Sequence, residues 1–199
     1  MTVLPYAFSA SQKLEVAKIL KRYPAKYKQS AVMPILWLLQ RDNKGWLTQG
    51  MIEAVAHVLG MQPLRVQELV SFYALYQDSP VGKHHIQVCR TLSCKLRGAG
   101  ALYQACRTQL GLTDGELSED GRFSLTRVEC LGCCANAPVV QINEDIHEDL
   151  TAESFVKILK ALQEDKTVIP GSACGRKSSK PWTDKVSGRQ PRKVSSNDT

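Results

Sequence analysis

The sequence has no apolar stretch long enough to cross a membrane as a helix. Its longest apolar run, AVMPILWLL at 31–39, has nine residues and includes a proline, whereas a spanning helix needs about 20. The first residues, MTVLPYAFSASQ, also lack the basic start, the apolar segment and the small-residue cleavage site of a secretory signal. We therefore expect a cytoplasmic chain whose thiols stay reduced.

A basic face interleaved with aromatic residues is missing as well. Aromatic residues make up 7% of the chain, and eight of the 26 Lys and Arg residues fall in 166–199, where only two Asp or Glu accompany them. Residues 1–165 are consequently close to neutral. Because a nucleic-acid-binding protein carries its basic side chains on the folded surface, we expect no nucleic-acid partner.

Cysteine, in contrast, is abundant, with seven residues in the chain. Secreted disulfide domains are small and usually use an even number of cysteines, so a reduced chain of this size points instead to metal or redox chemistry.

The first 78 residues show the period of helices. One helix stops at Pro24, a second follows Ser30, a third runs from an N-cap at Thr48 to Gly60, and a fourth opens at Pro63. These four segments predict a small helical bundle over 1–78. The apolar positions expected to face its core include Leu14, Ala17, Ile19 and Leu20 in the first helix and Leu64, Leu69, Tyr73 and Tyr76 in the fourth.

The period changes after residue 78. HHIQVC alternates like a strand with Ile86 and Val88 on one face, RGAGALYQACRTQLG returns to helix, GRFSLTRVEC and VVQINED read as strands, IHEDL could pair back, and Thr151 caps a last helix. This order over 79–165 is that of a thioredoxin-like layer of sheet and helices, which makes the fold class α+β. Residues 166–199 lack apolar periodicity and are expected to be a tail that only a partner orders.

Two cysteine groups follow two of these strands. Cys89 and Cys94 flank RTLS after the first, and Cys130 with Cys133 or Cys134 follows the second. Loops at one end of neighbouring strands can present four sulfurs to one point. The wide C-x4-C spacing favours a binuclear iron–sulfur cluster over a zinc ion, whose loops are usually tighter. Spacing alone leaves the choice between Cys133 and Cys134 open.

The runs PVGKHHIQVCRTLSCKLRGA and VECLGCCANAPVVQINED resemble the thioredoxin-like 2Fe-2S subunit of respiratory NADH:quinone oxidoreductase, complex I. The likeness extends upstream through RYPAKYKQSAVMPILWLLQ and ELVSFYALY and covers about residues 20–165. In that family the second pair reads C-L-G-x-C. The resemblance therefore implies four cluster ligands, and it puts Cys133 where a small residue is usual. The implied ligands are Cys89, Cys94, Cys130 and Cys134.

The same resemblance implies a function. The chain would hold one 2Fe-2S cluster that exchanges one electron with the flavin of a partner subunit, and that partner, not this chain, would bind FMN and NADH. The isolated chain would not be catalytic. Further peripheral-arm subunits are implied as partners, with quinone as the final acceptor and a location on the cytoplasmic side of the membrane. Relatives in NAD-reducing hydrogenases and NAD-dependent formate dehydrogenases are an alternative, and a zinc-stabilised adaptor is another. The GRKSS segment at 175–179 resembles one that ends many bacterial members, where it contacts a partner, and it favours complex I.

The remaining candidates are given structural roles. Cys106 is expected in the core of its helix, Cys174 as a lone thiol in the tail, and neither His84 nor His85 as a ligand. The glycines in GAGALY, Gly98 and Gly100, form an incomplete dinucleotide fingerprint, and we interpret them as small residues that let a helix start pack near the cysteine loop.

Overall fold

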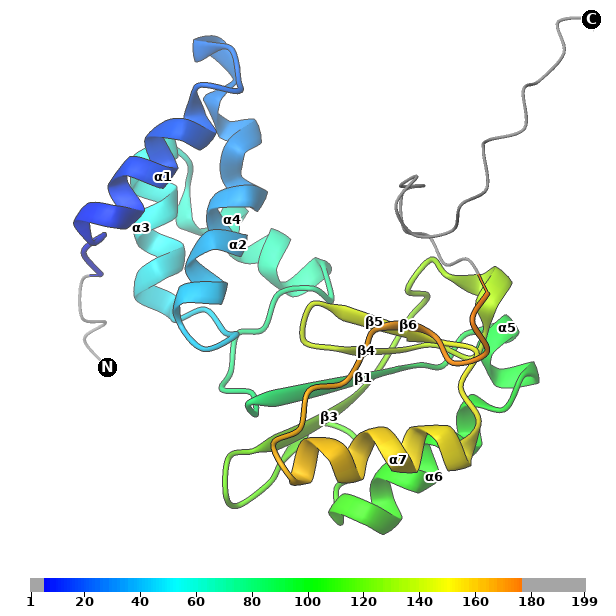
Figure 1. The fold of residues 1–199 in the computed structure, drawn as a ribbon. Helices are drawn as coiled ribbons and strands as arrows, with labels where there is room; N and C mark the ends of the chain where they lie inside the picture. The colour runs from blue at the N-terminus through cyan, green and yellow to red at the C-terminus, as the bar shows by residue number, and fades with distance from the viewer. Residues whose placement is uncertain (1–5, 177–199) are drawn as a thin grey trace, which may run out of the picture.

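The computed structural model describes residues 6–176, which form a helical unit followed by a sheet covered by helices (Figure 1). The helical unit consists of α1 (Ala10–Leu20), the 3-10 segment η1 (Ala25–Ala31), α2 (Val32–Asp42), α3 (Gln49–Leu59) and α4 (Pro63–Phe72). All four helices expected from the sequence are present in this unit.

Local chemistry explains where these helices begin and end. Ser9 and Gln12 form a capping box at the start of α1, and the Thr48 side chain accepts a hydrogen bond from the Met51 N–H at the start of α3. Gly60 ends α3 with a φ of 64°, a left-handed conformation that glycine adopts without strain. Pro63 occupies the first turn of α4, where no backbone donor is needed.

The predicted core faces of α1 and α4 are partly wrong. Leu14 is 66% exposed and Leu64 69% exposed. In α4 the buried residues are Val66 and Val70 instead. Both helices carry apolar residues on more than one side, so the period alone could not tell which stripe faces inward.

The second unit is built on one mixed sheet. Its strands are β1 (His84–Cys89), β2 (Glu116–Leu117), β3 (Phe123–Val128), β4 (Val140–Ile142), β5 (Asp145–Glu148) and β6 (Gly171–Ser172), and its helical segments are α5 (Leu92–Leu96), α6 (Ala99–Leu110), η2 (Cys134–Asn136) and α7 (Ala152–Gln163). The spatial order is β2-β3-β1-β4-β5-β6. β1 pairs in parallel with β3 and antiparallel with β4. The expected α+β class is confirmed.

The central strand β1 contacts different partners on its two faces. Ile86 and Val88 point to the core beneath α6 and α7, as their alternation predicts, and Cys106 is fully buried in the same core. Both helices lie along one face of the sheet (Figure 1). On the other face the Gln87 side chain donates to the Ala74 carbonyl oxygen at 3.4 Å, which links the sheet to the end of the helical unit.

The chain does not leave the sheet after α7. Gly171 and Ser172 pair in parallel with His147 and Glu148 of β5, so residues 171–172, expected from the sequence to belong to the tail, form an edge strand. Residues 177–199, including most of GRKSS and most of the basic tail, lie outside the described residues. Within the part of the chain that the structure describes, no helix is long and apolar enough to span a membrane.

Candidate functional site

The parallel pairing of β1 with β3 brings the two cysteine groups to one edge of the sheet. Cys89, the last residue of β1, is in register with Val128, the last residue of β3. α5, which carries Cys94, follows β1 at the end away from the helical unit (Figure 1). The loop after β3 carries Cys130 and leads into η2, which begins at Cys134. The predicted ligands thus lie at the end of β1 and in the segments that directly follow β1 and β3.

Cys130 and Cys134 form an exposed pair whose sulfur atoms are 3.2 Å apart. The Gly132 N–H lies 3.4 Å from the Cys130 sulfur, and Gly132 has a φ of 84°, which permits this tight turn. This backbone donor and the neighbouring Cys134 thiol lower the pKa of Cys130. The pKa of Cys134 is raised, chiefly because its thiol donates to Cys130 and would be charged beside it.

Cys89 and Cys94 form a second, buried pair, each 1% exposed. Burial by itself raises the pKa of Cys89, but hydrogen bonds from Thr91, from the Cys94 thiol and from the Leu131 backbone outweigh burial, so the pKa lies below its ordinary value. Burial and the bond to Cys89 raise the pKa of Cys94 to about 12. In each pair, therefore, one sulfur has a lowered pKa and its neighbour a raised pKa.

Side chains between the cysteines connect the two pairs. The Thr91 hydroxyl, 3.3 Å from the Cys89 sulfur, also bonds to Cys130, and the Ser93 side chain bonds to Cys134. These hydroxyls were not singled out from the sequence, although their positions in RTLS made them natural candidates. Within residues 6–176, no three His, Cys, Asp or Glu side chains are arranged to hold a single metal ion. The donor set itself, four thiols in two adjoining pairs, fits a binuclear iron–sulfur cluster.

Cys133 lies differently from its neighbour. Its side chain is half-buried and packs against a small apolar cluster formed by Cys89, Cys94, Ala99, Ala137 and Val139. Its sulfur also lies 3.8 Å from the Leu131 carbonyl oxygen. Adjacent loop residues point in different directions here, and Cys134 is the one whose sulfur lies beside that of Cys130.

The interpretation of Gly98 and Gly100 as packing residues is wrong. A Cβ atom at either position would meet nothing within 4 Å. Gly98 has a φ of 100° where the chain turns from α5 into α6, so backbone conformation is what requires this glycine. The small residue that does pack beside the cysteines is Ala99, which is 4% exposed.

Of the basic residues around the first loop, Arg90 forms an ion pair. Its guanidinium lies 2.5 Å from the Glu129 carboxylate, which precedes Cys130. Lys95 and Arg97 are exposed on and after α5. The Arg90 charge is therefore largely offset by an acidic neighbour. The main effect of this ion pair is to link the segment after Cys89 to the segment before Cys130.

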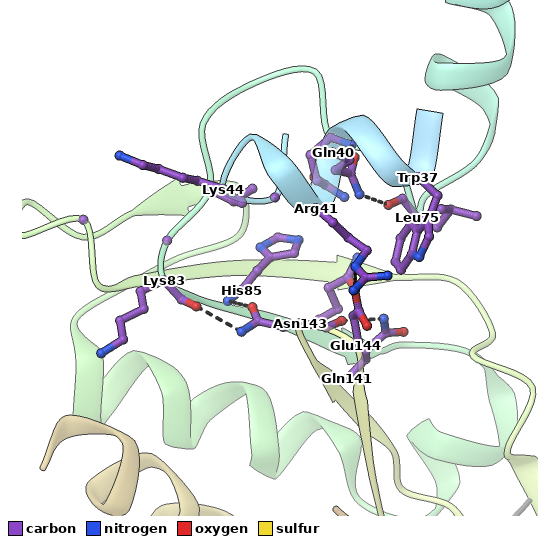
Figure 2. Close-up of a pocket in the computed structure, with 16 residues that line it drawn as sticks. Trp37, Gln40, Arg41, Lys44, Leu75, Lys83, His85, Gln141, Asn143 and Glu144 are labelled. Carbon is purple, nitrogen blue, oxygen red and sulfur yellow. Dashed lines mark hydrogen bonds and ion pairs between the residues drawn. The ribbon is translucent and has the colours of Figure 1, made fainter. Parts of the chain in front are cut away.

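A cavity of about 530 Å³ lies at the other end of β1, between the helical unit and the sheet (Figure 2). Arg41 and Glu144 form an ion pair across it at 3.1 Å. His85 is 7% exposed on its wall, and burial lowers its pKa to about 4. This histidine and His84, whose ring packs on Phe123, lie at the start of β1, at the opposite end of the strand from Cys89. The residues that line the cavity include Trp37, Arg41, Lys44, His85, Gln141 and Glu144.

Comparisons with known proteins find relatives by sequence and by fold. Residues 16–163 match the sequence model of the thioredoxin-like [2Fe-2S] ferredoxin family. The chain is 40% identical over 174 residues to a Dictyostelium discoideum protein named NADH dehydrogenase [ubiquinone] flavoprotein 2, mitochondrial, a match that covers 87% of this chain and 70% of that protein. It is 48% identical over 147 residues to a subunit of the NADH-quinone oxidoreductase of Rickettsia bellii, covering 74% and 88% of the two chains.

Solved structures also share the fold. The air-oxidised NAD⁺-reducing [NiFe]-hydrogenase matches 65% of this chain with a TM-score of 0.56 and 18% identity. The match spans only 23% of that hydrogenase chain. At this identity the likeness concerns the fold alone.

Proposed function

The chain belongs to the thioredoxin-like [2Fe-2S] ferredoxin family, and from this premise we propose that it is the electron-transfer subunit of an NADH:quinone oxidoreductase of the complex I type. The observation that carries the proposal is the meeting of two thiol pairs at the carboxyl ends of β1 and β3. A bound 2Fe-2S cluster supplies the capacity to take up and give back one electron.

Four residues of this chain would hold the cluster: Cys89, Cys94, Cys130 and Cys134. Each of the four thiols would lose its proton when the cluster binds, and the hydrogen bonds that lower the pKa of Cys89 and Cys130 favour that loss at two of them. The Gly132 N–H and the Thr91 and Ser93 hydroxyls would donate hydrogen bonds to ligand sulfurs. Such donors stabilise the charge on the sulfurs and thereby tune the potential at which the site accepts an electron.

The partner in this proposal is a protein that binds NADH and FMN, since the flavin can divide the two electrons of a hydride into single electrons. Further subunits of the peripheral arm and a position on the cytoplasmic side of the membrane belong to the same proposal. The support on this chain is a pair of exposed leucines that flank Cys94. Leu92 is 73% exposed and Leu96 78% exposed on α5, and apolar side chains so exposed beside a redox site favour a protein contact.

The experiment that tests the cluster is metal analysis with electron paramagnetic resonance of the reduced full-length protein. We expect two irons and two sulfides per chain and the signal of a reduced binuclear cluster; one zinc and no signal would refute the proposal. Serine at Cys89, Cys94, Cys130 or Cys134 should abolish or severely weaken the signal. Alanine at Cys133 or Cys106 should preserve it, because Cys133 packs in an apolar cluster and Cys106 in the core.

The partner contact is tested by charge introduced on α5. Leu92→Asp with Leu96→Asp should weaken binding to the flavin-bearing subunit by tenfold or more, as buried apolar anchors do when truncated or charged, and leave the cluster signal unchanged. Leu14→Asp is the matched control, because Leu14 is 66% exposed on α1 of the helical unit. Equal binding by the double variant and the wild type, measured by calorimetry, would place the interface elsewhere.

A further inference from the structure

The turn that follows Cys134 is hydrogen-bonded to the end of β5. The Asp149 N–H donates to the Asn136 carbonyl oxygen at 2.8 Å, and the Asn136 side-chain amide donates to the Glu148 carboxylate at 3.0 Å. Both side chains of this second bond are buried, Asn136 at 8% and Glu148 at 1% exposure. The backbone around Asn136 is thereby fixed to the sheet.

A second contact on the same turn comes from Arg176. Its Nη2 donates to the carbonyl oxygen of Ala135, the residue directly after Cys134, at 3.2 Å. The same guanidinium is paired with Asp149, through Nε to Oδ2 at 3.2 Å and through Nη2 to Oδ1. One planar cation thus joins a buried carboxylate to the peptide that adjoins a predicted ligand.

Arg176 reaches this position because the preceding segment is anchored. Ser172 of β6 pairs with Glu148, and its hydroxyl donates to the Asp149 carboxylate at 2.5 Å. The Arg176 N–H then donates to the Ser172 hydroxyl oxygen at 3.1 Å. The Asp149 side chain is only 6% exposed, and its pKa is lowered to about 2 by Arg176 first and by Ser172. The ion pair is therefore present throughout the physiological pH range.

We propose that Arg176 and Asp149 are positioning residues of the cysteine site: the pair fixes the Cys134 turn, and each charge balances the effect of the other on the electron affinity of the site. This proposal rests on the proposed function. The positive guanidinium stabilises the reduced site, which carries one more negative charge, and the negative carboxylate stabilises the oxidised site relative to the reduced one. Each charge offsets the other, so the intact pair contributes little net potential while its hydrogen bonds hold the turn.

The test compares midpoint potentials of full-length variants, followed by electron paramagnetic resonance during a redox titration. Arg176→Gln leaves Asp149 uncompensated and should shift the potential down, whereas Asp149→Asn leaves Arg176 uncompensated and should shift it up. The double variant should return towards the wild-type potential. Arg176→Lys keeps the charge without the planar double contact, so it should keep a near wild-type potential.

The rate of cluster loss to a chelator gives a second measurement. Arg176→Gln and Arg176→Lys should both lose iron about 3- to 10-fold faster than the wild type, the factor expected when a net-stabilising hydrogen bond is removed. Arg122→Gln is the matched control. Arg122 also joins a carboxylate, that of Asp165, to backbone carbonyl oxygens, those of Leu162 and Gln163, but it does so at the opposite end of β3.

Shifts of one sign in both single variants, unchanged potentials in both, or equal loss rates in Arg176→Gln and Arg122→Gln would overturn the inference. If the wild type itself holds no 2Fe-2S cluster, the proposed function fails first, and the two failures are distinguished by metal analysis before any variant is made. If Arg176→Gln does not fold, as judged by circular dichroism, the potential of Asp149→Asn and the chelator rate of Arg176→Lys still decide the question.

Discussion

At the scale of single residues, His85 carries the clearest dependence on pH. Its ring is buried, its Nδ1 lies 2.7 Å from the Ser124 hydroxyl, and its Nε2 has no hydrogen-bond partner among the described residues. Desolvation lowers its pKa from 6.5 to about 4. Between these two values the unfolded chain binds a proton that the folded chain excludes. The contribution of neutral His85 to the free energy of unfolding is therefore fully present above pH 6.5, and it is lost as the pH falls towards 4.

We expect wild-type stability to fall by about 1.4 kcal/mol per pH unit from this residue, and by ~3 kcal/mol over the whole interval. His85→Gln should remove this part of the dependence of the free energy of unfolding on pH. Urea unfolding at pH 7 and pH 5 measures it, and the difference between variant and wild type isolates His85 from His147 and His84, whose pKa values burial also lowers. Identical slopes in the two proteins would show that His85 takes up its proton freely.

How far single residues could be predicted differs between the cysteines and their supports. Cys89, Cys94 and Cys130 follow from strand ends and spacing, because parallel neighbours present their loops at one edge. Adjacent residues have no period in a loop, so the sequence pattern could not separate Cys133 from Cys134. The ion pair of Asp149 with Arg176 joins residues 27 positions apart, and no local signal indicates a contact at that distance.

At the scale of elements, Gly82 controls how β1 enters the sheet. A Cβ atom there would lie 2.5 Å from the Phe123 backbone carbon and 2.7 Å from the Ser124 nitrogen. The Gly82 N–H also donates to the Ser124 hydroxyl oxygen at 2.9 Å. The close approach, more than any special φ, requires glycine at this position.

Gly82→Ala should therefore destabilise the protein by about 1–3 kcal/mol, the usual cost of forcing an extra methyl group into a packed site. Gly100→Ala is the matched control with the opposite sign. It lies in α6 with open space around its Cα, so we expect a gain of roughly 0.5–1 kcal/mol from helix propensity. Thermal or urea unfolding measures the change in stability of both variants. If Gly82→Ala left the stability unchanged, β1 and β3 would be able to move apart at little cost.

Elements were predicted best where the sequence contains both a period and a stop signal. α3 has both, with Thr48 at its start and Gly60 at its end. β6 has neither. Its two residues, Gly171 and Ser172, have low strand propensity and form a strand because the β5 backbone offers hydrogen bonds. An edge strand of this kind depends on tertiary structure, which a reading of local pattern does not contain.

At the scale of the whole molecule, the two units have separate cores. The core of the helical unit extends from Val16 to Tyr76, and the core under the sheet begins at Ile86. The sheet face towards the helical unit carries polar side chains such as His85, Gln87 and Gln141, which line the cavity between them. The ion pair of Arg41 with Glu144 is exposed and contributes little to stability.

We therefore propose that residues 79–176 fold and hold the cluster without the helical unit. The fragment should give the same electron paramagnetic resonance signal as the full-length protein, because every thiol of the site and its supports lie within it. Its stability should fall modestly, since removal of the helical unit uncovers mainly polar surface. A fragment that stays cluster-free under conditions that load the full chain would show that the helical unit shapes the site.

The parallel pairing of β1 with β3 also determines when the two cysteine pairs come together during folding. The chain makes Cys89 and Cys94 early, yet Cys130 and Cys134 reach them only after α6 has crossed over and β3 has docked beside β1. Contacts that close so long a loop form late, because the chain loses conformational entropy before these contacts contribute any favourable free energy. Iron delivered to the half-formed domain would meet two thiols and no more. If the four thiols hold the cluster as proposed, we expect a chain to retain iron only after this crossover is complete.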